Sequence, residues 1–268
     1  TPAALADFVE QRDAGALRQP EAVLAALRRV KACDPACGSG AYLLGLLHEL
    51  VELRQALFVS RRVDALTTYA RKLEIIQQNL YGVDVDPFAV NIARLRLWLS
   101  LIVDFEGETP PPLPNLEFKI EAGDSLTAPA PAPLQPDLFR QQDVARFFEL
   151  KGAFMQAHGP EKKALRAEIE ALKATIAAWA GEESGAGAFD WAVDFAEVFT
   201  PLDFSYEGEG GGASIPHRSS PLSQLHAPGQ AGGGFDLVVA NPPYVRQELL
   251  GSALKARLKK RYPAVYTG

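Results

Sequence analysis

The most chemically specific segment of the sequence is Asn241-Pro242-Pro243-Tyr244, which directly follows the apolar run 235–240. Neither proline has a backbone N–H, and both favour extended or turn conformations. The side-chain oxygen of Asn241 and the carbonyl of Pro242 can therefore act as two fixed acceptors for the two hydrogens of one planar amino group. This would free the nitrogen lone pair to attack a methyl sulfonium, while Tyr244 stacks on the base. The alternative is a strand-ending turn with a packed tyrosine.

A glycine-containing loop follows the short apolar run 30–34, which ends in Asp34. Gly38 and Gly40 allow the backbone to turn tightly and to approach a ligand closely. The residues that follow, 41–57, have the spacing and composition of a helix. A strand, a glycine loop and a helix in succession are shared by many nucleotide-binding folds, and a purely structural turn is the alternative.

Two further acids follow predicted strands, at positions where a nucleoside could be bound. Asp84 ends the segment 79–86, and its carboxylate can accept both hydroxyls of a ribose. Asp124 follows the segment 116–121 and can accept a hydrogen bond from the amino group of an adenine. The alternatives are a helix N-terminal charge for Asp84 and an ordinary turn for Asp124. The sequence contains neither the glycine fingerprint of a dinucleotide site nor a P-loop, so an adenosine ligand is favoured over a pyrophosphate.

These segments must be positioned by alternating strands and helices, which predicts an α/β fold with a mostly parallel sheet. Ligands bind at the carboxyl ends of the strands of such sheets, and every motif above lies at such an end. The predicted strands are 30–34, 79–86, 116–121 and 235–240. The predicted helices are 3–12, 20–29, 41–57, 66–79, 87–101 and a hairpin within 138–180. We expect a cofactor-binding half at 1–127, a proline-rich linker and helical hairpin insert at 128–188, and a catalytic half at 189–268.

Net charge, hydrophobic patterning and cysteine content restrict the kinds of protein and site that the chain can form. The 268 residues carry a formal net charge of −6, which argues against this chain gripping DNA alone. The basic residues between 255 and 261 could contact phosphates or form a solvated helix face. No apolar run is long enough to span a membrane, and no signal peptide is recognised. Cys33 and Cys37 are too few for a zinc site, so we expect no metal and two reduced intracellular thiols.

The segments DPACGSGAYL, YGVDVDP, GDSL and FDLVVANPPYVRQE resemble the successive motifs of amino-group DNA methyltransferases. Within that group, the sequence is most similar to the large single-chain type IIG restriction-modification enzymes and related phage-defence methyltransferases. The segments Thr1-Pro2 and 189–199 also resemble parts of that family. The resemblance implies a Rossmann-like S-adenosylmethionine-dependent sheet, truncated in this chain, and a cytoplasmic enzyme of a prokaryote that methylates N6 of adenine.

The resemblance also implies a role for individual residues. The residues expected to hold S-adenosylmethionine are Thr1, Asp34, Ala36, Gly38, Gly40, Asp84, Val85 and Asp124. Among them, Asp84 would bind the ribose, Val85 would pack on the adenine ring, and Asp124 would meet its amino group. Asn241 and Pro242 would hold a target adenine flipped out of double-stranded DNA, with Tyr244 stacked on it. Neither cysteine is expected to be a nucleophile.

Other functions stay open at this point. The Asn-Pro-Pro-Tyr segment could instead bind a glutamine amide in a protein or an amino group in RNA for methylation. A cofactor-fold module without activity, whose hairpin docks a partner, is a candidate of another class. The loop Asp-Pro-Ala-Cys-Gly-Ser-Gly and the Val-Arg-Gln-Glu extension favour DNA. Since a target-recognition domain is expected outside this chain, we expect the chain alone to bind DNA weakly and to lack demonstrable specificity.

Overall fold

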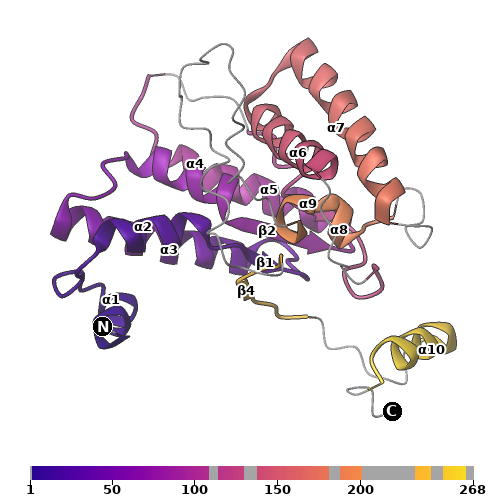
Figure 1. Ribbon diagram of the computed structural model, residues 1–268, viewed down its shortest axis with the longest axis horizontal. Coiled ribbons are helices and arrows are strands. Elements are labelled where there is room, and N and C mark those ends of the chain that lie inside the picture. Colours follow the sequence, from indigo (N-terminus) through magenta and orange to yellow (C-terminus); the bar gives the residue numbers. More distant parts are fainter. Residues whose placement is uncertain are drawn as a thin grey trace.

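The computed structural model confirms the predicted α/β fold, with four parallel strands at its centre (Figure 1). It describes residues 2–108, 114–129, 138–180, 188–200, 233–242 and 250–263. The strands are β1 (Ala32–Asp34), β2 (Leu80–Asp84), β3 (Ile120–Ala122) and β4 (Leu237–Val238), in the order β3-β2-β1-β4. Because all four are parallel, their carboxyl ends lie along one edge of the sheet.

Strand β1 pairs on both sides with strands that come from distant parts of the sequence. Cys33 in β1 pairs with Tyr81 in β2 on one side and with Val238 in β4 on the other. The backbone N–H of Val239 donates to the carbonyl of Cys33 at 3.0 Å and extends the pairing beyond β4. The loop after β1 and the Asn241 segment after β4 therefore leave the sheet side by side.

Three helices cover the first face of the sheet, and each was expected from the sequence. They are α3 (Ala41–Arg61), α4 (Thr68–Gln78) and α5 (Pro87–Ile102). Their apolar side chains pack on Ala32, Leu80 and Ile120, which point to this face. Helix α5 begins where predicted, because the carboxylate of Asp86 accepts the N–H of Phe88 at 2.9 Å and Pro87 needs no donor.

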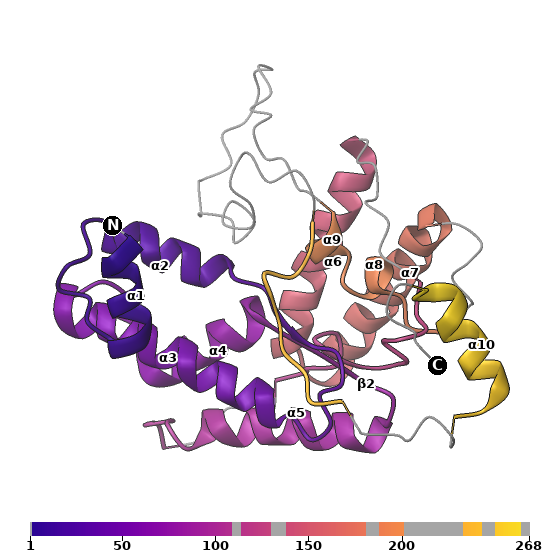
Figure 2. The same ribbon diagram turned by 90° about the horizontal axis from the view of Figure 1, so that it is seen from below.

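The second face is covered by helices that follow β3 in the sequence, and Figure 2 shows them on the other side of the strands from α3 to α5. They are α6 (Leu138–Gln156), α7 (Gly159–Ala180), α8 (Trp191–Asp194) and α9 (Ala196–Phe199). Helices α6 and α7 form the predicted hairpin, and their apolar side chains pack together with Phe118 and α8–α9. A buried ion pair between Lys151 and Glu197, at 2.8 Å, joins α6 to α9. The hairpin therefore forms part of the hydrophobic core on the second face of the sheet.

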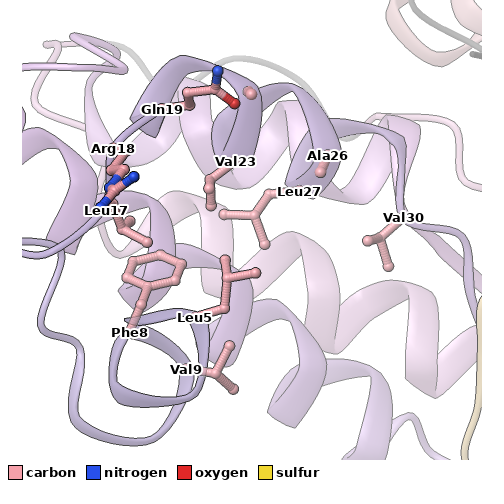
Figure 3. A pocket seen from close by; sticks show the side chains of 11 residues that line it. Leu5, Phe8, Val9, Leu17, Arg18, Gln19, Val23, Ala26, Leu27 and Val30 are labelled. Atoms are coloured by element: carbon pink, nitrogen blue, oxygen red, sulfur yellow. The ribbon is translucent and has the colours of Figure 1, made fainter. Parts of the chain in front are cut away.

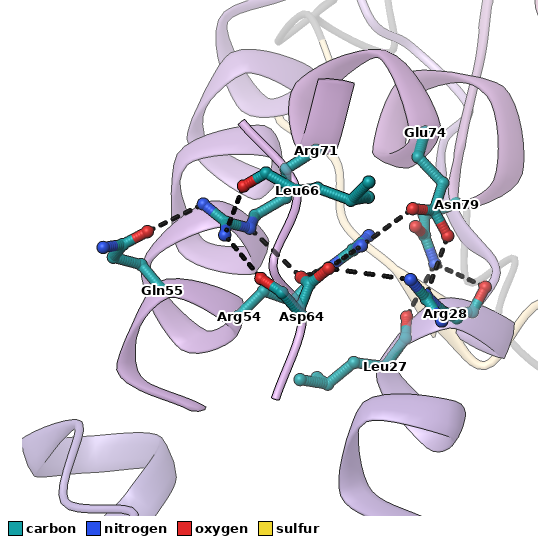
Figure 4. A network of polar contacts seen from close by, with 9 residues as sticks. All are labelled: Leu27, Arg28, Arg54, Gln55, Asp64, Leu66, Arg71, Glu74 and Asn79. Carbon is teal, nitrogen blue, oxygen red and sulfur yellow. Dashed lines mark hydrogen bonds and ion pairs between the residues drawn. The ribbon is translucent and has the colours of Figure 1, made fainter. Parts of the chain in front are cut away.

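A buried polar network joins α3, α4 and the N-terminal helix α2 (Pro20–Arg29), which follows α1 (Pro2–Gln11) (Figure 4). The carboxylate of Asp64 accepts hydrogen bonds from Arg54 at 2.6 Å and from Arg71 at 3.1 Å. All three side chains are at most 1% exposed. Although burial opposes ionisation, the two guanidinium groups hold the pKa of Asp64 below its ordinary value. A second carboxylate, that of Glu74 in α4, pairs with Arg54 at 2.8 Å and with Arg28 of α2 at 2.9 Å, so the network joins the three helices through two acids.

All four observed strands are shorter than predicted, and two of them differ in a further respect. The third begins at Ile120 instead of 116, because the N–H groups of Lys119 and Ile120 bond to the carbonyl of Leu116 and form a turn. The fourth was expected to be buried, but Leu237 and Val238 are 42% and 59% exposed. The prediction was wrong because β4 lies at the edge of the sheet, and none of the described residues covers these side chains.

A final helix, α10 (Ser252–Arg261), lies beyond β4 and has no buried residue. Most of the predicted proline-rich linker, together with Thr1 and Tyr244, falls outside the described residues. Among the helices that the structure describes, none is long and apolar enough to cross a membrane.

Candidate cofactor and catalytic site

The loop after β1 has the tight geometry that its glycines predict. Gly38 and Gly40 have positive φ angles of 50° and 81°. A Cβ on Gly40 would lie 2.9 Å from the Cβ of Ala93 in α5, so only glycine fits this contact. By contrast, a Cβ on Gly38 would meet no atom within 4 Å. The loop is thus packed against α5 at Gly40 and open at Gly38, as a ligand cradle requires.

Asp84 fixes this loop to the end of β2. Its carboxylate accepts the backbone N–H of Gly38 at 2.7 Å through Oδ2 and that of Asp86 at 2.9 Å through Oδ1. Asp84 is half-buried, and each carboxylate oxygen has a second lone pair. The geometry leaves Asp84 able to accept further hydrogen bonds from a ligand at the edge of the sheet.

Asp34 is a buried carboxylate at the end of β1, and its side chain is only 1% exposed. Oδ1 accepts the N–H of Ala36 at 3.1 Å, and no described residue forms an ion pair with the carboxylate. Burial, with the negative charge of Asp84 nearby, raises the pKa of Asp34, although the hydrogen bond from Ala36 opposes this shift. Buried charges are ordinarily paired. The position therefore favours a cationic group beside Asp34.

Asp124 organises the loop that follows β3. Its carboxylate accepts the N–H groups of Leu126 and Thr127 and the hydroxyl of Thr127. Partial burial opposes ionisation, but these bonds and the charge of Arg257 hold the pKa of Asp124 below its ordinary value. The hydroxyl of Ser125 donates to the carbonyl of Pro35 at 2.6 Å. The loops after β1 and β3 are thereby joined.

Exposed apolar side chains lie beyond the ends of β2 and β3. Val85, which was expected to pack on an adenine ring, is 74% exposed, and Leu126 is 48% exposed. Leu126 was not predicted from the sequence, although an apolar residue directly after a turn is a signal that could have found it. Arg96 was also missed: its guanidinium donates to the carbonyl and hydroxyl of Ser39. No local motif marks Arg96, because it lies in the third turn of α5 and reaches Ser39 only through the fold.

The catalytic segment lies next to this loop cluster. Asn241 and Pro242 are exposed and follow β4 by three and four residues. Asp34 follows the last residue of β1 that pairs with β4, so the loops after the two strands are neighbours. Among described residues, none makes a hydrogen bond with the amide of Asn241, which leaves it accessible. The described part of the predicted site is therefore gathered at one edge of the sheet.

Neither the cysteines nor the two cavities described below indicate a further catalytic or metal site at this edge of the sheet. Both thiols are free and buried, and burial raises the pKa of Cys37 to about 12. The described residues contain no cluster of metal-binding side chains. An apolar groove of about 610 Å³ lies between α1 and α2 (Figure 3), and a cavity of about 400 Å³ lies beside Lys119 and Glu197. Neither contains a residue of the predicted site.

Comparison with protein families gives a match over most of the chain. Residues 78–268 match the family described as Eco57I restriction-modification methylase. The chain belongs to this family. Residues 10–108 also match the DNA-methyltransferase domain of MmeI. The two matches together cover the glycine loop, the three acids and the Asn241 segment, as the motif resemblance predicted.

Three curated relatives are similar to parts of the chain. A protein of Methanocaldococcus jannaschii, named as a type II restriction enzyme and methyltransferase, is 41% identical over 109 residues, or 39% of this chain. DNA methyltransferase A of Bacillus subtilis is 30% identical over 80 residues, or 30% of this chain. The adenine-specific methyltransferase PglX of Streptomyces coelicolor is 29% identical over 122 residues, or 45% of this chain. The matched regions span only 9%, 9% and 10% of these relatives.

Proposed function

We propose that this chain is the cofactor-binding and catalytic part of a site-specific DNA methyltransferase of a restriction-modification or phage-defence system. It would transfer the methyl group of S-adenosylmethionine to N6 of an adenine in double-stranded DNA. The observation that carries the proposal is the convergence of Asp34, Asp84 and Asp124 with the Asn241 segment at one sheet edge. The names of the relatives, which include an adenine-specific methyltransferase, support adenine as the target.

The structure offers chemical groups that fit S-adenosylmethionine, whose methionine part carries a cationic amino group. Asp34 is a buried carboxylate without an ion-pair partner among the described residues. It would bind that amino group, with Ala36, Gly38 and Gly40 forming the backbone cradle. Asp84 would accept the ribose hydroxyls. Val85, which is exposed, would pack on the adenine ring, whose exocyclic amino group would donate to Asp124.

Catalysis by this chain would consist of positioning and electrostatics. The amide oxygen of Asn241 and the carbonyl of Pro242 would accept the two hydrogens of the target amino group, which makes its nitrogen a better nucleophile. S-adenosylmethionine, when bound, supplies the electrophilic methyl group. The exposed position of this segment is consistent with a base that has left the duplex, and Tyr244 would stack on that base.

The proposal is tested by methyl transfer from radiolabelled S-adenosylmethionine in the full-length protein. With Asn241→Ala, DNA labelling should fall by about 100- to 1000-fold while cofactor affinity stays the same, because only the hold on the amino group is lost. Asn91→Ala is the matched control, since Asn91 is exposed on α5, away from this segment. Retained activity in Asn241→Ala, or label in protein or RNA instead of DNA, would overturn the proposal.

A further inference from the structure

Helix α10 carries an unusual concentration of positive charge for a chain with a net charge of −6. Five of its ten residues are basic and none is acidic: Lys255, Arg257, Lys259, Lys260 and Arg261. Bases in the last turn stabilise a helix through its dipole, which accounts for Lys259, Lys260 and Arg261. The dipole does not account for Lys255 and Arg257, which precede that turn.

The helix is anchored on the loop cluster of the candidate site. The guanidinium of Arg261 donates to the carbonyl of Thr127 at 3.2 Å, and the hydroxyl of Tyr262 donates to the carbonyl of Leu126 at 2.8 Å. This is the loop that Asp124 organises and that Ser125 joins to the loop after β1. Helix α10 therefore stands at the sheet edge where the predicted cofactor and catalytic residues gather.

The side chains of the remaining bases of α10 form no hydrogen bond or ion pair with a described residue, although the charge of Arg257 helps to lower the pKa of Asp124. Arg257, Lys259 and Lys260 are exposed, and no described carboxylate forms an ion pair with them or with Lys255. Solvated helix faces ordinarily mix charges of both signs. In contrast, a uniformly positive surface beside a nucleic-acid site suits the negative phosphate backbone. Such charges position the nucleic acid but do not read its sequence.

We propose that α10 is a phosphate-binding surface that holds the DNA backbone next to the adenine that enters the site at Asn241. The inference rests on the proposed function and extends it by naming the part of this chain that contacts the duplex. The anchors Arg261 and Tyr262 fix the helix on the Asp124 loop, and Lys255, Arg257, Lys259 and Lys260 face the phosphates. Since these contacts are electrostatic, the contribution of α10 to DNA binding decreases as salt rises.

The test compares two double variants of the full-length protein, each of which removes two positive charges. Lys259→Gln/Lys260→Gln neutralises two exposed bases of α10 and keeps its anchors, whereas Arg18→Gln/Lys163→Gln neutralises one exposed base before α2 and one on α7. The dissociation constant for a DNA duplex is measured from low to high salt. The α10 variant should lose about 10- to 100-fold in affinity at 0.1 M salt, and its logarithmic salt slope should fall by about two.

The control should keep the wild-type affinity and slope, and both variants should keep the wild-type affinity for S-adenosylmethionine. An unchanged salt slope in the α10 variant would overturn the inference, as would an equal change in the control. If wild-type protein methylates DNA and the slope is unchanged, only the role of α10 is rejected. If wild-type protein does not methylate DNA, the proposed function fails and this inference fails with it.

Discussion

The carboxylate of Asp84 accepts the backbone N–H of Gly38 at 2.7 Å, which joins the end of β2 to the glycine loop that follows β1. Asp84 thus shapes the cradle in which it would also bind a ribose. The loop is further fixed by the N–H of Cys37, which donates to the carbonyl of Val83 at 2.9 Å. One carboxylate is expected to serve both the loop conformation and the cofactor.

Asp84→Asn should weaken binding of S-adenosylmethionine by about 10- to 100-fold, measured by calorimetry. Hydrogen bonds to charged groups contribute about 1.5–3 kcal/mol, and the amide can accept through one oxygen only. Asp86→Asn is the matched control, because Asp86 is exposed and caps α5, a role that asparagine performs equally well. Similar affinities for the two variants would remove Asp84 from the cofactor site.

Asp64→Asn should lower the free energy of unfolding by about 3–5 kcal/mol, because Arg71 would remain buried without a carboxylate partner among the described residues and Arg54 would keep only Glu74. Denaturant titration measures this, with Asp7→Asn as an exposed control on α1. The pKa of Asp64 is lowered in the folded state, so its contribution is complete above the unfolded pKa of about 3.9. It is lost as the pH falls through the folded pKa. A difference between variant and wild type that is independent of pH would contradict this account.

The thiols of Cys33 and Cys37 should react slowly with iodoacetamide at pH 8 in the folded protein. Burial raises the pKa of both thiols, that of Cys37 to about 12, so only about one in 10⁴ Cys37 groups is a thiolate at that pH. In denaturant, where an ordinary pKa of about 8.5 returns, both should react quickly. Mass spectrometry identifies the modified residue. Equal rates in the two states would contradict the burial of these thiols in the folded protein.

Several features followed from the sequence because they depend on neighbours along the chain. The positive φ of Gly40 and the capping of α5 by Asp86 are set within a few residues. The α6–α7 hairpin was recognised from the spacing of its apolar residues, which reflects one buried face. The placing of the acids after strands was also local, since each is contiguous with its strand.

Other features could not be predicted because their partners are distant. Asp64 looks like an ordinary loop residue until α3 and α4 bring Arg54 and Arg71 to it. The exposure of Leu237 and Val238 depends on the position of β4 at the sheet edge, which an apolar run does not encode. A buried central strand and an exposed edge strand have the same sequence pattern here.

The sequence by itself determined which residues are able to do chemistry and that each lies at the end of a strand. Only the tertiary structure decided that the strand before Asn241 pairs with the strand before Asp34, about 200 residues earlier, and that α10 is anchored on the Asp124 loop. The physical reason is that motif identity is a property of a few contiguous residues. Strand order and the docking of a polar helix are instead set by hydrogen bonds and packing between segments that the sequence separates.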